Sequence, residues 1–379
     1  GDGGRVAQKP NRSCAQLAAD SLLIAHGLPD DAVGCFPGTN AIGISNQGGG
    51  FAFTANGGTD DVSVIDVRRA IDGDPASDAP LVILVHGFPE SWYSWRHQLT
   101  PLAGAGYTAC AIDVRGYGGS DKPEAIEDYA LEKIVGDLVG LKTALSPDRP
   151  AILIGHDWGA PIVWNTALTN PQHFRAVAGL SVPFSGVPQR PFTEVFHQHF
   201  TSQGKFFYQE YFQEPGVAEA EAEKDPRDFV QRMMYSISGD VPPGNYWDKP
   251  YGATFLEGLP DPAPVSWLTE DDLDFYEAEF RASGFRGPLN RYRNHERDFE
   301  WLQNFKDRRI EQPSLFIGGT RDPATFLFGA VTDPVALMRM FAPKIEGHIL
   351  DGVGHWTQQE RPEEVNRLLL DWLKQLDEE

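Results

Sequence analysis

Residues 151–170 restrict the fold more than any other part of the chain. A short apolar run at 151–154 is followed by Gly-His-Asp-Trp-Gly at 155–159, and then by a helix-like segment opened by Pro161. Glycines on both sides of a central residue permit a strained turn in which strand and helix approach closely. This strand–turn–helix layout is that of a nucleophile elbow, whose central residue is usually serine. Here the central residue is Asp157.

An aspartate at this position suits a different reaction from a serine. Serine must lose a proton before it attacks, whereas aspartate, with an ordinary pKa of ~3.9, is already ionised at neutral pH. Its carboxylate can displace a leaving group at saturated carbon and form an ester with the enzyme. Hydrolysis of that ester needs water and a base, so we expect a histidine later in the chain, together with an acid that orients it.

The remaining strand and helix patterns place this turn in an α/β fold. Residues 81–85 form a continuous apolar run, typical of a strand buried in a parallel sheet. Further strands are predicted at 63–67, 107–113, 176–180, 314–317 and 344–350, and amphipathic helices at 131–145 and 364–376. Alternation of this kind predicts a mostly parallel sheet with helices on both faces.

The composition changes between residues 183 and 294. This part of the chain is rich in aromatic and charged residues and lacks apolar strand runs. Thr269 and Asp272 resemble a capping box, and Gly284 is a stop signal, so one helix is predicted between them. The acidic stretch 219–224 is interpreted as a solvated helix face. We expect residues 185–294 to form a mainly helical cap, inserted into a core made of residues 1–184 and 295–379.

Residues 1–75 are irregular, and a leading β-meander is expected there. The three cysteines, Cys14, Cys35 and Cys110, give neither a metal site nor a disulfide framework. Cys14 and Cys35 could pair in a secreted protein whose leader has been removed. Free thiols in a cytoplasmic protein are the favoured interpretation.

Charge and hydropathy limit the partners. A net charge of −22 disfavours binding to nucleic acid or anionic membranes. No apolar run approaches the ~20 residues that span a bilayer. We therefore expect a small-molecule substrate, no nucleic-acid partner and no membrane span, in a monomer or a homodimer.

Three functional candidates follow predicted strands: Asp157, Asp322 and His355. Ligands and chemistry gather at that edge of α/β sheets, and the order nucleophile, acid, histidine is that of the α/β-hydrolases. Taken singly, Asp322 could cap a turn and His355 could be a core histidine bonded to backbone. Together they favour a catalytic constellation. Asp351 is a competing acid, but it lies too close in sequence to His355 to be well placed.

The chain resembles the epoxide hydrolases of the α/β-hydrolase fold, of the soluble type, from about residue 81 to residue 376. The matching segments are 86–89, 155–159, 208–215, 284–292 and 352–355. Soluble mammalian members carry an N-terminal phosphatase domain. Fewer than about 85 residues precede the first buried strand here, too few for such a domain, so no lipid-phosphatase activity is expected.

The resemblance implies a set of site residues and no cofactor or metal. It places the nucleophile at Asp157, the base at His355, its orienting acid at Asp322, two cap tyrosines at Tyr208 and Tyr292, and the oxyanion N–H groups at Phe88 and Trp158. A tyrosine, with a pKa of ~10, is a neutral donor that can bind and protonate an epoxide oxygen. Spacing alone does not choose Tyr208 over Tyr211.

These residues predict an epoxide hydrolase that forms vicinal diols through an ester on Asp157, hydrolysed by water that His355 activates. A haloalkane dehalogenase is the alternative, because it shares nucleophile, base and fold, and Trp158 could donate to a halide. The tyrosine pair favours an epoxide. A haloacid-type member needs a basic residue beside the nucleophile, where this chain has Trp158. A non-catalytic ligand receptor on the same scaffold has no need for His355 and Asp322.

Overall fold

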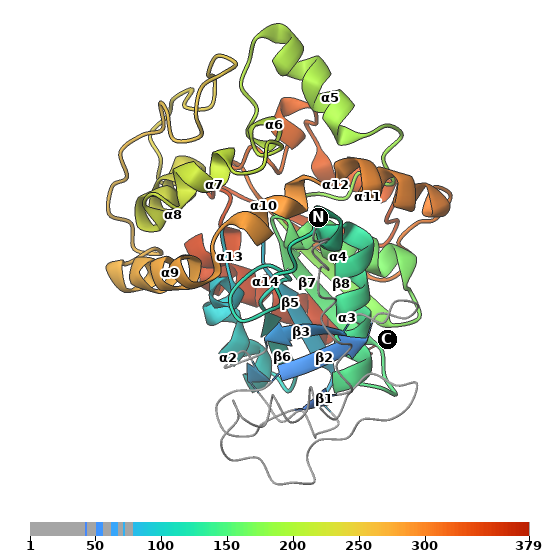
Figure 1. Cartoon of the computed structure of the whole chain (residues 1–379). Helices are drawn as coiled ribbons and strands as arrows, with labels where there is room; N and C mark the ends of the chain where they lie inside the picture. The colour runs from blue at the N-terminus through green and yellow to red at the C-terminus, as the bar shows by residue number, and fades with distance from the viewer. Residues whose placement is uncertain (1–41, 44–50, 56–61, 67–70, 73–78, 379) are drawn as a thin grey trace, which may run out of the picture.

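The computed structural model describes residues 42–43, 51–55, 62–66, 71–72 and 79–378 (Figure 1). Cys14, Cys35 and most of the region 1–75 lie outside the described residues. Within the part that is described, no helix combines the length and the apolarity that crossing a bilayer requires.

A seven-stranded sheet, in the order β10-β9-β8-β7-β5-β6-β4, organises the described residues. The strands from β5 onward pair in parallel, and β4 (Ile71–Asp72) pairs antiparallel with β6 at one edge. The parallel strands are β5 (Leu81–Val85), β6 (Thr108–Ile112), β7 (Ala151–His156), β8 (Phe174–Leu180), β9 (Ser314–Gly319) and β10 (Ile345–Leu350). The predicted fold class, a mostly parallel sheet with an inserted helical segment, is confirmed.

Strand register brings the ends of distant segments together. Val85 lies opposite Gly155, and Leu180 lies opposite Ile317. Because all these strands run in the same direction, the loops that follow β5, β7, β9 and β10 meet at one edge of the sheet. The candidate residues predicted after these strands therefore share that edge.

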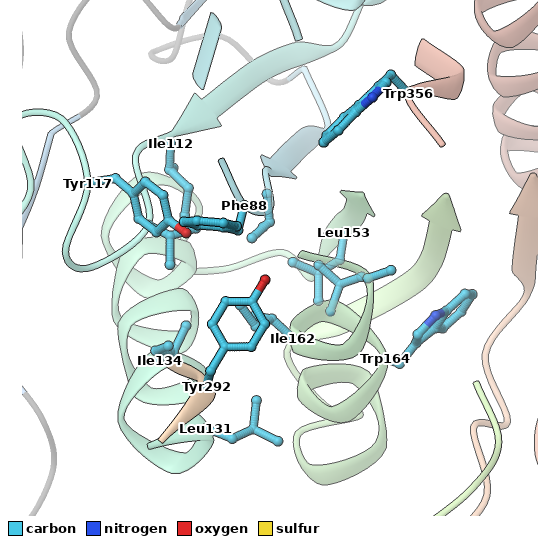
Figure 2. Packing of buried hydrophobic residues seen from close by; sticks show 14 of the residues in the cluster. Phe88, Ile112, Tyr117, Leu131, Ile134, Leu153, Ile162, Trp164, Tyr292 and Trp356 are labelled. Carbon is cyan, nitrogen blue, oxygen red and sulfur yellow. The ribbon is translucent and has the colours of Figure 1, made fainter. Parts of the chain in front are cut away.

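Helices cover both faces of the sheet because the strand residues alternate between two buried clusters. Ile83 and Val85 belong to the cluster that includes residues of α3 (Leu131–Leu145) and α4 (Gly159–Thr169), as Figure 2 shows for Ile134 and Ile162. Val82 and Leu84 pack on the opposite face with α2 (Arg96–Gly104) and α14 (Pro362–Glu378). Strands buried on both faces account for the continuous apolar runs in the sequence.

A small antiparallel sheet precedes β4. It consists of β1 (Ile42–Gly43), β2 (Phe51–Ala55) and β3 (Val62–Asp66), with β2 paired to both neighbours. Sequential antiparallel pairing is what the predicted meander requires. In Figure 1 these strands lie toward the lower end of the molecule.

The chain between β8 and β9 is mainly helical, and its helices gather above the sheet in Figure 1. We call residues 185–294 the cap segment; its exact boundaries stay a prediction. It holds α5 (Phe192–His199), α6 (Tyr208–Tyr211), α7 (Val217–Ala222), α8 (Pro226–Ser236), α9 (Glu270–Ser283) and α10 (Arg286–Tyr292). Outside it lie α11 (His295–Leu302), α12 (Pro334–Arg339), α13 (Thr357–Glu360) and short 3-10 turns such as η1 (Trp92–Trp95) and η5 (Leu327–Gly329).

Helix α9 forms as its sequence signals predict. The Thr269 hydroxyl accepts the N–H of Asp272, and the Asp272 carboxylate accepts the N–H of Thr269 at 2.8 Å. Gly284 then ends the helix with a φ of 70°. This reciprocal pair satisfies backbone donors that an uncapped helix would leave unpaired.

The expectation of a solvated acidic face at 219–224 holds for Glu223 and Lys224, which are exposed, but is wrong for Glu219 and Glu221. Glu219 is buried on α7 and forms an ion pair with Arg293, with 2.6 Å between Oε1 and a guanidinium nitrogen. The Glu221 carboxylate accepts the backbone N–H groups of Phe255 and Leu256. A local charge pattern cannot reveal partners that lie tens of residues away, so these acids had the sequence signature of a surface.

Candidate active site

Asp157 sits in a strained turn between β7 and α4. Its φ of 50° lies in the left-handed region, which is uncommon for residues other than glycine. The helix begins at Gly159, earlier than the expected opening at Pro161. A Cβ on Gly159 would come within 2.0 Å of the Val85 carbonyl oxygen, and one on Gly87 within 2.3 Å of Asp157 Oδ1. Glycine at position 159 lets the start of α4 pack against the end of β5, and glycine at position 87 lets the loop after β5 approach the Asp157 carboxylate closely.

The structure brings Asp157, His355 and Asp322 into one chain of hydrogen bonds. His355 Nε2 lies 3.1 Å from Asp157 Oδ2, and His355 Nδ1 lies 3.0 Å from Asp322 Oδ1. The Asp322 carboxylate also accepts the Ala324 N–H at 2.9 Å and the Thr325 hydroxyl at 3.0 Å. These contacts hold the Asp322 carboxylate against Nδ1 of the imidazole, so that Nε2 points toward Asp157.

Asp351, the competing acid, contacts neither of these groups. It is exposed, and its carboxylate accepts the Thr320 hydroxyl at 3.2 Å. Asp322 is therefore the acid that this fold presents to His355.

Charges inside the buried site set the protonation of its members. Burial alone would lower the pKa of His355, but the negative charges of Asp322 and Asp157 and the hydrogen bonds to them raise it well above its ordinary value. Burial alone would raise the pKa of Asp157, but the hydrogen bond from His355 and the charge on that ring lower it. The resting site therefore favours an ionised Asp157 beside a protonated His355.

A backbone donor also faces Asp157. The Phe88 N–H donates to Asp157 Oδ1 at 2.8 Å, from the loop that follows β5. Trp158 is the residue before the first turn of α4. A donor already aimed at one carboxylate oxygen can stabilise negative charge that develops there.

The two cap tyrosines face the same space as Asp157. Tyr208 begins α6, Tyr292 ends α10, and their ring centroids lie 6.0 Å apart. Burial and the nearby charge of Asp157 raise the pKa of both phenols, so both hydroxyls keep their protons at neutral pH. Tyr211, which the sequence could not separate from Tyr208, donates its hydroxyl to Glu221 instead.

One cavity of about 230 Å³ contains side chains of all five candidate polar residues. These are Asp157, Tyr208, Tyr292, Asp322 and His355. Its other walls are mostly aromatic or aliphatic and include Phe200, Phe206, Phe207, Met233, Trp247 and Leu327. Neither lysine nor arginine is among the described residues that line it. The cavity suits an uncharged, apolar molecule with one polar reacting centre.

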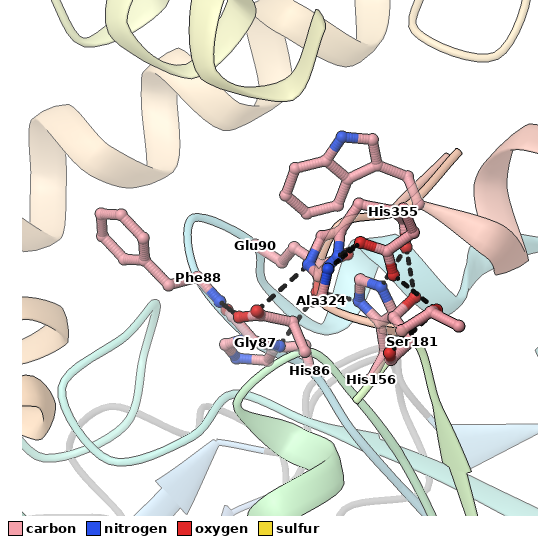
Figure 3. A network of polar contacts seen from close by, with 12 residues as sticks. His86, Gly87, Phe88, Glu90, His156, Ser181, Ala324 and His355 are labelled. Carbon is pink, nitrogen blue, oxygen red and sulfur yellow. Dashed lines mark hydrogen bonds and ion pairs between the residues drawn. The ribbon is translucent and has the colours of Figure 1, made fainter. Parts of the chain in front are cut away.

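A second buried network supports the base and was missed by the sequence analysis (Figure 3). His156 Nδ1 lies 2.8 Å from a Glu90 carboxylate oxygen, and His156 Nε2 lies 2.7 Å from the His355 carbonyl oxygen. Both ring nitrogens thus face oxygen atoms, one on a side chain and one on the backbone that carries the base. Burial alone would raise the pKa of Glu90, but the charge of His156 lowers it. The only sequence signal was position, because Glu90 and His156 flank Phe88 and Asp157 at the strand ends.

Across the described ranges, no three His, Cys, Asp or Glu side chains form a group that could hold a metal ion.

Comparison with known proteins shows the family of this chain. Residues 80–362 match the family model of the alpha/beta hydrolase fold. Epoxide hydrolase A of Mycobacterium tuberculosis is 44% identical over 323 residues, which cover 84% of this chain and 97% of that protein. The chain belongs to the epoxide hydrolases of the α/β-hydrolase fold.

Solved structures of epoxide hydrolases share the architecture. An epoxide hydrolase from an endophytic Streptomyces superposes with a TM-score of 0.79 at 42% identity, covering 88% of this chain and 97% of that one. Potato (Solanum tuberosum) epoxide hydrolase I gives a TM-score of 0.72 at 29% identity, covering 86% and 99%. The dehalogenase alternative finds no support among these relatives.

Proposed function

We propose that this enzyme converts epoxides and water into vicinal diols through a covalent ester on Asp157. The observation that carries the proposal is the shared cavity, in which an ionised carboxylate, a histidine with its orienting acid and two protonated phenols face one apolar space. A ligand receptor would need the apolar walls but not this set of reactive groups.

In the first step Asp157 attacks one carbon of the epoxide ring. The carbon–oxygen bond of the ring breaks, and its electrons move to the epoxide oxygen. Tyr208 and Tyr292 bind that oxygen, and one of them gives it a proton, leaving a phenolate. Positioning both partners in one cavity replaces the entropy cost of a bimolecular encounter.

In the second step His355, held by Asp322, takes a proton from water, and the resulting hydroxide attacks the ester carbon. Negative charge then develops on an oxygen of Asp157 that the Phe88 N–H, and by our proposal the Trp158 N–H, stabilises. Collapse releases the diol and restores the carboxylate. The proton that the resting imidazolium carries first passes to the phenolate through solvent, which frees His355 to act as the base. Of the two protons of the water, one then protonates the departing alkoxide and the other stays on His355, so the cycle balances and the resting site is restored.

Ester formation also prepares the base. In the resting site, the charge of Asp157 helps to hold the proton on His355. Once Asp157 is esterified that charge is gone, and the pKa of His355 should fall. The imidazole then loses its proton more readily and can act as a base when water must be activated.

Replacement of the phenols tests the first step. Tyr208→Phe and Tyr292→Phe should each slow ester formation about 10- to 100-fold, because the remaining phenol can still donate. The double variant should slow it about 1000-fold, because it lacks a general acid altogether, a loss that typically costs 10²–10⁴-fold. Stopped-flow tryptophan fluorescence can follow the step, because Trp158 lies beside Asp157 and packs on Tyr292, with 5.1 Å between the ring centroids. Ester formation at the normal rate in the double variant would exclude the phenols from catalysis.

The pH dependence should separate the two steps. A protonated His355 cannot accept a proton from water, so ester hydrolysis should slow as the pH falls from about 8 to 5. Ester formation needs an ionised Asp157, whose pKa is lowered, and should continue over that range. Ester should therefore accumulate at acid pH in rapid-quench experiments. A common acid limb for both steps would contradict this assignment.

The direct test of function is a substrate panel. Purified enzyme should be incubated with aryl, terminal alkyl and fatty-acid epoxides, with diol as the product measured. Haloalkanes of matching size form the parallel arm, with halide release as the readout. Diol without halide supports the proposal, and halide release without diol would replace it with dehalogenation.

A further inference from the structure

The segments that carry the two phenols are joined by the side chain of Gln213. Its Nε2 donates to the Gln209 carbonyl at 2.7 Å and to the Tyr292 carbonyl at 2.9 Å. Both partners are backbone acceptors, so the amide must present its NH₂ group to them, and its orientation is chemically fixed. One side chain thus binds the backbone of Gln209, which follows Tyr208, and the backbone of Tyr292.

A second set of bonds runs in the opposite direction. Arg293, which follows Tyr292, donates from Nε to the Phe212 carbonyl at 2.9 Å and from a terminal nitrogen to the Glu214 carbonyl at 3.3 Å. Those carbonyls flank Gln213 in the sequence. The Arg293 guanidinium is buried and paired with Glu219. The end of α10 and the chain after α6 are therefore tied from both sides.

These ties act on the parts of the chain that decide where the two hydroxyls lie. A tyrosine ring has only two side-chain torsions, so the hydroxyl follows its backbone closely. Phe212 packs against both rings, with its ring centroid 5.7 Å from that of Tyr208 and 5.0 Å from that of Tyr292. Gln213 itself is not among the described residues that line the cavity. Its influence on the reaction passes through the segments that it holds, which carry Tyr292 and Gln209, whose amide donates to the Tyr208 hydroxyl at 2.9 Å.

We infer that Gln213 is a positioning residue, which sets the spacing of the Tyr208 and Tyr292 hydroxyls for one epoxide oxygen. This inference rests on the proposed function. Both phenols must reach the same atom, and a displacement of about 1 Å in an active site can cost up to about 100-fold in rate. Without the two hydrogen bonds to the Gln209 and Tyr292 carbonyls, α6 and α10 keep their apolar contacts. They lose, however, the polar link that fixes their separation.

Gln213→Leu is the decisive variant, because leucine keeps much of the volume and removes both donors. Ester formation on an aryl epoxide should slow about 10- to 100-fold, while hydrolysis of the ester stays within about 3-fold, since the phenols take no part in the attack of water. The amide of Gln213→Asn is shorter and reaches one carbonyl at most, so its rate of ester formation should lie between those of the unaltered enzyme and Gln213→Leu. Gln203→Leu is the matched control, because its amide donates to the Gln198 carbonyl at 3.2 Å within its own segment.

A double-mutant cycle separates positioning from a general structural effect. In Tyr208→Phe or Tyr292→Phe backgrounds, the loss caused by Gln213→Leu should shrink, because there is no longer a pair to align. Equal losses in all backgrounds, equal slowing of both steps, or unchanged ester formation would overturn the inference. If the tyrosine variants themselves have normal rates, the proposed function of the phenols fails instead. Thermal unfolding of each variant checks the fold, and Gln213→Asn carries the test if the leucine variant does not fold.

Discussion

Asp157→Asn should reduce diol formation by about 10⁵-fold, a loss comparable to removal of the nucleophile in other covalent enzymes. The amide is nearly isosteric with the carboxylate and tolerates the left-handed backbone of this turn, where φ is 50°. It is, however, a poor nucleophile, so no ester should form. The steady-state rate of diol formation, measured with protein of confirmed mass, gives the result. Mass matters because hydrolysis of the new amide would regenerate aspartate.

Isotope labelling tests the same step in the unaltered enzyme. During a single turnover in ¹⁸O-water, hydroxide attacks the ester carbon, so the label should enter the Asp157 carboxylate and be absent from the diol. Peptide mass spectrometry of the segment that contains Asp157 locates it. Label found directly in the diol of the first turnover would mean that water attacks the epoxide itself, and the ester mechanism would be wrong.

His355→Gln should separate the two halves of the reaction. Glutamine can still hydrogen-bond to Asp157 but cannot act as a base, so ester formation should proceed and its hydrolysis should nearly stop. We expect turnover to fall by about 10⁵-fold, with a burst of one ester per active site. Intact-protein mass should rise by the mass of the substrate. This outcome differs from that of Asp157→Asn, for which neither burst nor adduct is expected.

Asp351→Asn is the matched control for these acidic and basic changes. Asp351 lies four residues before His355, is exposed and bonds to Thr320. Its loss should leave turnover within about 2-fold, as expected of a surface substitution away from special features. Continued multiple turnover in His355→Gln, or a severe loss in Asp351→Asn, would assign the base or its supporting acid to another residue.

The sequence predicted the sheet-edge part of the site because parallel strands leave little freedom. Asp157, Asp322 and His355 each follow an apolar run, and strands that run in one direction bring such positions to one edge. The tyrosines were harder. Tyr208 and Tyr211 are both on the four-residue α6 and are three positions apart, so periodicity cannot tell which one faces the cavity. Only the resemblance separated them.

Contacts between distant segments were beyond the sequence. Glu219 had the signature of a surface acid, yet it pairs with Arg293, 74 positions away. Glu90 contacts His156 across 66 positions. Such partners are set by how the cap segment and the strand-end loops pack. Residue type and local spacing carry no information about that packing.

The cavity takes its nucleophile and its histidine–acid pair from one part of the chain and several of its apolar walls from another. Asp157, Asp322 and His355 come from loops at the sheet edge, whereas Phe200, Phe206, Met233 and Trp247 come from the cap segment. Substitutions at these wall residues of the cap segment can therefore change which substrates bind without altering the groups that open the epoxide ring. Libraries aimed at new selectivity should be confined to those wall positions, with both phenols and Gln213 left intact.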